Sequence, residues 1–216
     1  MQISDLFAAG GVVMWPLLGF SILAIALIME RGVFWLRVNR RQPRVVRMVL
    51  ALYRNNFDDA LAKLKKNADL PIARIFLGAL EIDQADPEEF RLALETMAQA
   101  ELPSLKRFNT IFETIITLSP LLGLLGTVLG LINSFSSLTL GELGGSNTTG
   151  VTAGISEALV STASGLIVAI FTLLFANTFR GFYLRQMAFI QEYSGQLELL
   201  HRRRYQPVEV LDASTR

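Results

Sequence analysis

Three apolar segments dominate this sequence, and each is long enough to cross a lipid bilayer as a helix. They cover residues 10–29, 113–138 and 151–179, and a membrane-spanning helix needs about 20 predominantly apolar residues. The whole chain of 216 residues is 51% hydrophobic and 18% charged, whereas an average soluble domain has about 25% charged residues. We therefore predict an all-α, polytopic membrane protein with three transmembrane helices.

The positively charged residues predict how the chain is oriented in the membrane. All 20 Lys and Arg residues lie either between Arg31 and Arg107 or from Arg180 onward. Because cytoplasmic regions are enriched in Lys and Arg, we expect residues 30–112 and 180–216 in the cytoplasm and residues 1–9 and 139–150 outside. The first segment is not interpreted as a cleaved secretory signal, since the preceding MQISDLFAA has no positive charge and includes Asp5.

Both cytoplasmic stretches are predicted to be helical. FDDALAKLKK has the pattern of an amphipathic helix, and Pro71 suits the first position of the next one. Asp86, followed by a proline and two glutamates, is a typical helix start. We expect that helix to continue into the second span with one kink, at Pro103. Residues 180–216 are expected to form a helix followed by a disordered tail from Pro207. The cytoplasmic part would then be a helical stalk built on extensions of the membrane helices.

Small residues form a stripe on the second and third spans. At about 100° per residue, one side of the second span collects Pro120, Gly123, Thr127, Gly130, Ser134 and Ser137, with Gly126 at its margin. One side of the third span collects Gly150, Gly154, Glu157, Ser161, Ser164 and Thr172. Helices in lipid associate through close packing of small residues, so the glycines and Pro120 are predicted to serve helix packing, within a chain or between the subunits of a ring. Thr127 has a second interpretation, because a membrane threonine can bond its own backbone.

Glu157 is the charged residue of the third span. An ionisable side chain within a span is costly unless it is paired, protonated or hydrated. A structural glutamate near the membrane surface remains the alternative, since Glu157 lies six residues into the span. We expect it to face a hydrated, proton-conducting interior together with Ser161 and Ser164, which share its face.

The three spans together resemble the MotA/TolQ/ExbB proton-channel family. The segments that carry the resemblance are GGVVMWPLLGFSILAIALIMER, SPLLGLLGTVLGLINSF and GISEALVSTASGLIVAIFTLLFAN, in that order. The likeness is greatest to ExbB and next to TolQ, because MotA-type stators have four spans and a longer chain. The resemblance implies a location in the bacterial inner membrane, with the amino terminus in the periplasm and the carboxyl terminus in the cytoplasm.

The resemblance also implies partners and a pathway. It implies a homopentameric ring around the single membrane helices of an ExbD- or TolR-like protein that supplies a proton-carrying aspartate, with a TonB-like protein as a further partner. The family's lumen positions match Thr127, Glu157 and Thr162, although Thr162 lies about 140° from Glu157 on an ideal helix. Many relatives have Ala-Ile-Pro where this chain has Ala169-Ile170-Phe171, so the third helix is expected to be straighter.

Arginines near the cytoplasmic ends of the spans are candidates for binding anionic phospholipid head groups. They are Arg31, Arg37, Arg180 and Arg185. The basic run at residues 201–204 is interpreted as a solvated helix end rather than a nucleic-acid site. The chain has no cysteine, and its one histidine, His201, lies far from the spans, so we expect no metal site and no cofactor.

Three functions remain to be separated. The first is an ExbB-like channel subunit that uses the proton motive force to energise outer-membrane transport. The second is a TolQ-like subunit that serves envelope integrity, and the third is a membrane scaffold that conducts no protons. An enzyme is not expected, because the sequence lacks the membrane His-Glu metal motif and the Gly-x-Ser-x-Gly element.

Overall fold

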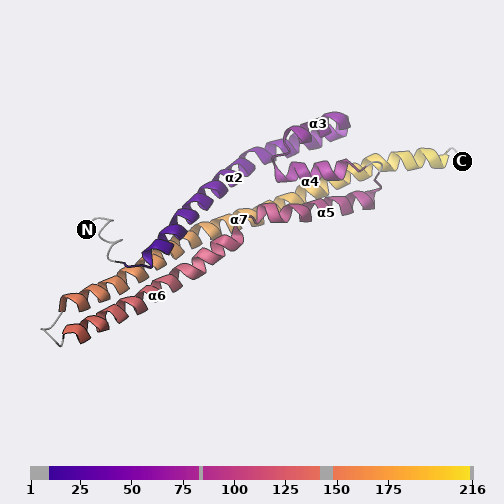
Figure 1. Ribbon diagram of the computed structural model, residues 1–216. Coiled ribbons are helices and arrows are strands. Elements are labelled where there is room, and N and C mark those ends of the chain that lie inside the picture. Colours follow the sequence, from indigo (N-terminus) through magenta and orange to yellow (C-terminus); the bar gives the residue numbers. More distant parts are fainter. Residues whose placement is uncertain (1–9, 83–84, 142–147, 215–216) are drawn as a thin grey trace. The chain divides into compact units, whose positions relative to one another are not determined.

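The computed structural model describes residues 10–82, 85–141 and 148–214, and this part of the chain is helical, without strands. Its helices are α2 (Met14–Asn55), α3 (Phe57–Lys66), α4 (Pro71–Leu80), α5 (Pro87–Leu105), α6 (Asn109–Gly141) and α7 (Thr148–Ser214). Figure 1 shows them in order along the chain. Three described helical stretches are long and apolar enough to cross a membrane, which confirms the all-α membrane class.

The chain divides into two compact units. The apolar unit comprises residues 10–30 and 108–178 among those described, and the polar unit comprises residues 31–107 and 179–214. Helices α2 and α7 each contribute a segment to both units. The division follows the amino-acid pattern, because the long apolar runs fall in one unit and the Lys and Arg residues of the described chain fall in the other.

In the apolar unit, α6 lies alongside the first part of α7 (Figure 1). From Ser119 onward on α6, and up to Thr172 on α7, the buried residues are small, and many large apolar side chains point outward. On α6 the outward-facing residues include Leu121, Leu124, Val128, Ile132 and Phe135, and on α7 they include Leu159, Ile167, Ile170 and Leu174. Such a surface suits lipid or a neighbouring apolar helix.

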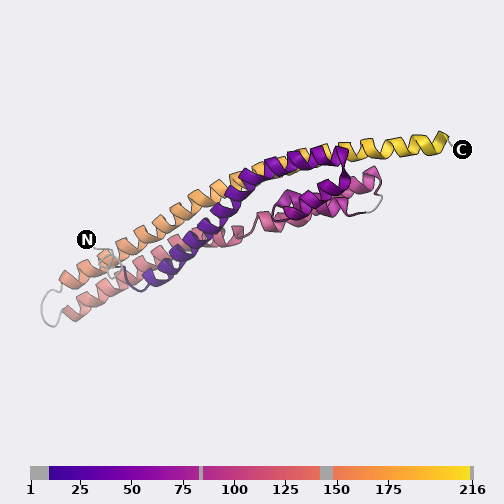
Figure 2. The same ribbon diagram turned by 90° about the horizontal axis from the view of Figure 1, so that it is seen from above.

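In the polar unit, α4 packs against α3 and α5 (Figure 2). The core is built from large side chains such as Trp35, Phe76, Phe90 and Leu197, each 2% exposed or less. Helix α4 is short but deeply buried, because seven of its ten residues are buried. The unit therefore resembles the core of a water-soluble domain, in which burial of apolar area stabilises the fold.

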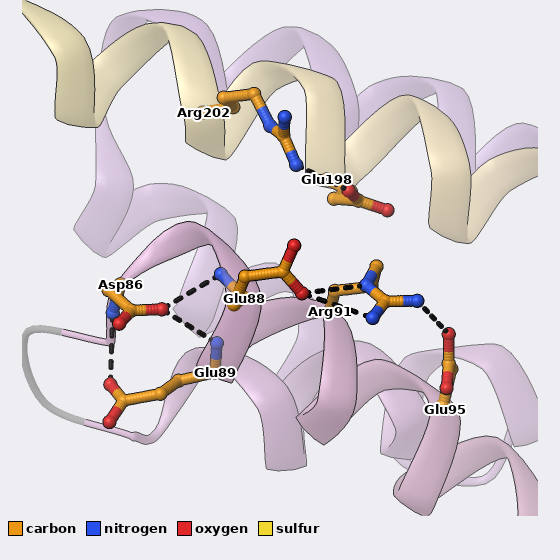
Figure 3. Close-up of polar contacts among 7 residues, drawn as sticks. All are labelled: Asp86, Glu88, Glu89, Arg91, Glu95, Glu198 and Arg202. Atoms are coloured by element: carbon orange, nitrogen blue, oxygen red, sulfur yellow. Dashed lines mark hydrogen bonds and ion pairs between the residues drawn. The ribbon is translucent and has the colours of Figure 1, made fainter.

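The start of α5 confirms the helix signal read from the sequence. The Asp86 side chain accepts hydrogen bonds from the backbone N–H groups of Glu88 and Glu89, both at 2.8 Å. The Glu89 carboxylate accepts one in return from the Asp86 N–H at 3.0 Å, which completes a capping box (Figure 3). On the next turn, Arg91 bridges Glu88 and Glu95 at 3.0 and 3.1 Å.

The predicted continuous helix from α5 into the second span was wrong. Pro103 lies inside α5, which continues to Leu105, and the helix breaks at residues 106–108 before α6 begins at Asn109. Phe108 has φ of 68°, a left-handed conformation that an α-helix does not contain. The side chain of Arg31 donates hydrogen bonds to the Ser104 carbonyl in the last turn of α5 and to the Arg107 carbonyl in the break.

The third span continues without a break into the carboxyl-terminal segment, as one helix. Helix α7 runs from Thr148 to Ser214 and passes through Phe171 and Pro207. The helix is continuous at Phe171, in agreement with the absence of a helix-breaking proline there. The disordered tail predicted from Pro207 was wrong, because the helix continues up to Ser214.

Candidate functional site

The contact between α6 and α7 is made by backbone approaching backbone. A Cβ atom on Gly130 would lie 2.5 Å from the Gly154 carbonyl oxygen and 2.9 Å from the Ala158 nitrogen. A Cβ on Gly123 would lie 3.0 Å from both the Ser161 carbonyl oxygen and the Thr162 Cα. No side chain fits in these positions without moving a helix, so the glycines set the distance between α6 and α7.

The stripes of small residues predicted from the sequence largely coincide with the buried faces of α6 and α7, although the two sets of residues are not identical. On α6 the buried residues are Phe112, Ile115, Ser119, Gly123, Gly126, Gly130 and Ser134, and on α7 they are Gly154, Ala158, Ser161, Gly165, Ala169 and Thr172. Five residues were predicted to pack helices. Four of them lie in the α6–α7 contact, namely Gly123, Gly126, Gly130 and Gly154, and Pro120 is half-buried at the edge of the contact. The structure therefore shows these glycines acting within one chain.

Glu157 lies at one flank of this contact and is partly exposed. Its Oε2 atom accepts a hydrogen bond from the Asn133 side chain on α6 at 3.4 Å. A Cβ atom on Gly11 would collide with Oε1 of the same carboxylate. The carboxylate thus has neighbours from α6 and from the turn that precedes α2.

The predicted threonine and serine residues are occupied by backbone contacts. Thr127 donates to its own helix, at the Leu124 carbonyl, at 2.6 Å, so the self-bonding interpretation holds in this structure. Thr162 donates across the helix contact to the Gly123 carbonyl at 3.2 Å. Ser161 is fully buried and donates to the Ala158 carbonyl at 2.9 Å, while the half-buried Ser164 donates to its own helix at 2.8 Å.

The structure does not bring Glu157 and Thr162 to one face of α7. The buried stripe that includes Ala158 and Ser161 runs between them, because Glu157 and Thr162 lie about 140° apart around the helix. Ser164 is on the Glu157 flank, and the Thr162 flank is also that of Thr127 on α6. Within a single chain Glu157 and Ser164 therefore form one group and Thr127 and Thr162 another, with Ser161 buried between them.

Two residues beside Glu157 were missed by the sequence analysis, namely Gly11 and Asn133. The pair Gly10-Gly11 at the start of the first span and an amide side chain inside the second span were visible signals. They could not be connected to Glu157, because helical periodicity does not give the register of one helix against another.

The basic residues fall into two classes. Arg37, Arg180 and Arg185 are exposed, as expected for lipid-binding candidates. Arg31 is 2% exposed, and its guanidinium donates to the carbonyl groups of Arg107 at 2.6 and 2.9 Å and of Ser104 at 3.1 Å. The expectation that Arg31 binds a lipid head group is therefore wrong for this structure, since its donors are directed to the end of α5.

The basic run at residues 201–204 is more than a solvated helix end. Its arginines are exposed as expected, but the His201 ring stacks on Phe90 with centroids 4.0 Å apart. The ring nitrogens lie 2.8 Å from the Tyr53 hydroxyl and 3.0 Å from the Ala85 carbonyl. Burial raises the pKa of Tyr53, against an opposing effect from Arg204. His201 thus joins α7 to α2 and α5 inside the polar unit.

A second polar contact of this unit joins α4 to α5. Arg74 donates to both carboxylate oxygens of Glu101 at 2.6 Å and to the Ala68 carbonyl at 3.0 Å. The hydrogen bond to Glu101 raises the pKa of Arg74, so the guanidinium stays charged. Among the described residues, no group of three or more His, Cys, Asp and Glu side chains could hold a metal ion.

Comparison with known proteins gives consistent results. Residues 67–192 match the family model described as "MotA/TolQ/ExbB proton channel family". The chain is 64% identical over 209 residues to a putative biopolymer transport protein ExbB-like 3 from Synechocystis, with 96% of this chain and 100% of the relative covered. It is 42% identical over 202 residues to ExbB-like 1 from the same organism, covering 93% of this chain and 80% of the relative.

A more distant relative comes from an archaeon. The putative ExbB homolog of Methanothermobacter thermautotrophicus is 26% identical over 168 residues, which cover 77% of this chain and 58% of the relative. The match to the family model includes α4, α5 and the second and third spans, where the glycine contact and Glu157 lie. This transport family is not a family of enzymes, and the relatives named above carry ExbB names. The chain belongs to the MotA/TolQ/ExbB proton-channel family.

Proposed function

We propose that this chain is an ExbB-like subunit of an inner-membrane proton channel. With an ExbD-like single-span partner it uses the proton motive force to energise transport across the outer membrane. The observation that carries the proposal is Glu157, a partly exposed carboxylate inside a span of a chain that belongs to a proton-channel family. A buried, fully paired glutamate would instead have favoured a packing role.

A partner is needed because a single carboxylate cannot carry protons across the whole membrane. Hydrocarbon about 30 Å thick separates the two sides of the membrane. Among the described residues of the three spans, Glu157 is the one ionisable side chain away from their ends. A membrane aspartate on a single-span partner, together with water, would supply the further proton-exchanging groups.

A ring is the second element of the proposal. Glu157 lies on one flank of the α6–α7 contact, and Thr127 and Thr162 lie on the other. In a closed homo-oligomer with head-to-tail interfaces, each subunit presents one flank to one neighbour and its other flank to the next. A pentamer around the partner would allow both groups to line a shared interior. Thr127→Val and Thr162→Val are then expected to reduce transport less than loss of Glu157.

The exposed arginines fit the same picture at the membrane surface. Arg37, Arg180 and Arg185 flank the first and third spans, and anionic head groups attract arginine side chains near the surface. We propose that these three residues hold anionic phospholipid. Purified protein should retain more anionic than zwitterionic lipid, and a triple change to glutamine should remove that preference.

The experiment compares the chain alone with the chain plus its partner. The partner tested is an ExbD-like protein with a single span that contains an aspartate. Vesicles that contain both proteins should take up protons when a potential is imposed, and vesicles with either protein alone should not. Native mass spectrometry of the same preparation should show a homopentamer. A stable monomer, or proton uptake no greater than in empty vesicles, would favour the scaffold.

A TolQ-like role is the second candidate, and the transport experiment cannot separate it. The relatives named ExbB-like favour the ExbB role. Deletion of the gene decides between them, because loss of energy-dependent uptake through the outer membrane indicates the ExbB role, whereas leakage of periplasmic proteins and a division defect indicate the TolQ role.

A further inference from the structure

The turn before α2 is shaped around the carboxylate of Glu157. Gly11 has φ of +69°, a left-handed conformation that residues with a Cβ atom rarely adopt. A Cβ atom at this position would collide with Oε1 of Glu157 and lie 2.7 Å from its carboxyl carbon. The missing side chain of Gly11 therefore leaves the space that the carboxylate fills.

The turn is packed against the helices rather than free at the chain end. The Met14 N–H donates to the Gly11 carbonyl at 3.2 Å, which closes the turn. Val13 is 4% exposed and lies against Gly126 on α6, since its Cβ is 3.7 Å from where a Gly126 Cβ would be. A Cβ on Gly10 would likewise lie 3.3 Å from Val160 of α7. The turn is thus seated on the flank of the α6–α7 contact that carries Glu157.

The other oxygen of the carboxylate has a neighbour on α6. Asn133 donates from its side-chain amide to Oε2 of Glu157 at 3.4 Å. Asn133 itself is exposed, so packing does not require an amide at this place. Both oxygens of Glu157 are therefore placed by residues outside α7.

We propose that Gly11 and Asn133 are positioning residues of Glu157, and that the Gly10–Gly11 turn covers its carboxylate. A side chain at position 11 displaces the carboxylate from under the turn, while the helices stay in place, because the colliding atoms are the end of a flexible side chain. The positioning itself follows from geometry. Its consequence for transport rests on the proposed function.

The test measures the reactivity of Glu157 with dicyclohexylcarbodiimide, an apolar reagent that enters membranes. The protonated carboxyl group adds across the carbodiimide to give a stable N-acylurea without a leaving group, and mass spectrometry of peptides measures its rate of formation. In the assembled protein, Gly11→Ala should raise the rate at Glu157 several-fold over a range of pH. The matched control is Gly19→Ala in α2, because a Cβ on Gly19 meets no atom within 4 Å.

A shorter acid separates the collision from backbone strain. Glu157→Asp withdraws the carboxylate by one methylene group, while φ of residue 11 remains strained by alanine. In the Glu157→Asp background, Gly11→Ala should therefore leave the rate of labelling unchanged. Asn133→Ala should raise labelling of the native Glu157 by a smaller factor than Gly11→Ala does. The result for this variant does not depend on whether the turn tolerates a substitution.

The outcomes distinguish this inference from the proposed function. Equal labelling rates in native protein, Gly11→Ala and Asn133→Ala would overturn it, and so would an equal effect of Gly11→Ala with aspartate at position 157. If labelling changes as expected but proton uptake by the same vesicles does not, the positioning stands. In that case the proposed role of Glu157 in proton transport is contradicted.

Discussion

Helix α7 packs in two different ways along its length. In the apolar unit it contacts α6 through Gly154, Ala158, Ser161 and Gly165, with backbone against backbone. In the polar unit its buried residues include Ile190 and Leu197, and between α5 and α7 there is a groove of about 460 Å³, lined by residues such as Leu94, Ile190 and Glu198. The same helix thus has a tightly fitted half and a more loosely fitted half.

The difference follows from the amino-acid composition of the two halves, of which one suits lipid and the other suits water. Lipid is as apolar as leucine, so helices within it gain little from burying large side chains, and they associate through close contact and hydrogen bonds. In water, burial of large apolar side chains stabilises the fold, and exact backbone spacing matters less. Substitutions in the apolar unit should therefore act through steric fit, and those in the polar unit through lost side-chain contacts.

The largest effect is expected from Gly130→Leu. The new side chain would meet the backbone of Gly154 and Ala158, so α6 and α7 must separate, at a cost of about 3 kcal/mol or more. Gly19→Leu is the matched control, since its position is open. Unfolding of the detergent-solubilised protein by added SDS gives both stabilities. Equal stability of the two variants would contradict the close contact.

The next effect is expected in the polar unit from Arg74→Ala. It removes a two-pronged bond to Glu101 and a bond to the Ala68 carbonyl. The side chains are partly exposed, at 35% and 15%, so we expect a loss of about 2 kcal/mol rather than the larger cost of a fully buried pair. Arg74→Lys keeps the charge but cannot form both hydrogen bonds to Glu101. Thermal unfolding should therefore show that lysine recovers less than half of the stability lost with alanine.

A smaller, strictly pairwise effect is expected between Gly126 and Ser161. A Cβ on Gly126 would collide with the Ser161 side chain rather than with backbone. Gly126→Ala should therefore destabilise the protein, and Ser161→Gly should relieve the collision, with a coupling energy of about 1 kcal/mol in a double-mutant cycle. Additive effects of the two changes would show that the contact is not formed.

The smallest effect concerns alkaline pH and the polar unit alone. Burial raises the pKa of Tyr53 above its ordinary value of 10.0, so the folded state holds the phenol proton more tightly than the unfolded state does. This stabilisation is complete below about pH 10 and is lost as pH rises through the folded-state pKa. Tyr53→Phe should flatten the decline of stability above about pH 10. An unchanged decline in Tyr53→Phe would exclude Tyr53 as its source.

The sequence predicted the helices better than the contacts between them. Apolar run length was sufficient for the three spans, and Pro71 and Asp86 marked the starts of α4 and α5 because their chemistry is local. The break at residues 106–108 was missed, because the carbonyl partners come from Arg31, 73 and 76 residues away in the sequence. Long-range partners of this kind leave no periodic signal.

The candidate site was predictable to the same extent. Glu157 stood out because an ionisable residue in a span is costly, and the glycine stripe followed from helical periodicity. Arg31 was assigned to lipid because the sequence places it at the end of a span, whereas in the structure its side chain is buried and donates to the Arg107 carbonyl in the break after α5. Gly11 and Asn133 required the register of three chain segments, which only the folded structure supplies.

The central claim is that Glu157 carries or controls proton flow, and one measurement tests it most directly. Vesicles that contain the chain and the proposed ExbD-like partner are compared with vesicles in which Glu157→Ala or Glu157→Gln replaces the native residue, and proton uptake is driven by an imposed potential. Glu157→Gln keeps the shape and hydrogen bonding of the side chain but cannot titrate. Ser156→Ala, at the exposed neighbouring position, is the control, and native mass spectrometry checks that the variants have the same oligomeric state as the native protein. We predict at least about a tenfold loss of uptake in both Glu157 variants, equivalent to about 1.4 kcal/mol in the barrier, and no loss in the control. Normal uptake in both Glu157 variants would show that Glu157 is a packing residue and would contradict the account.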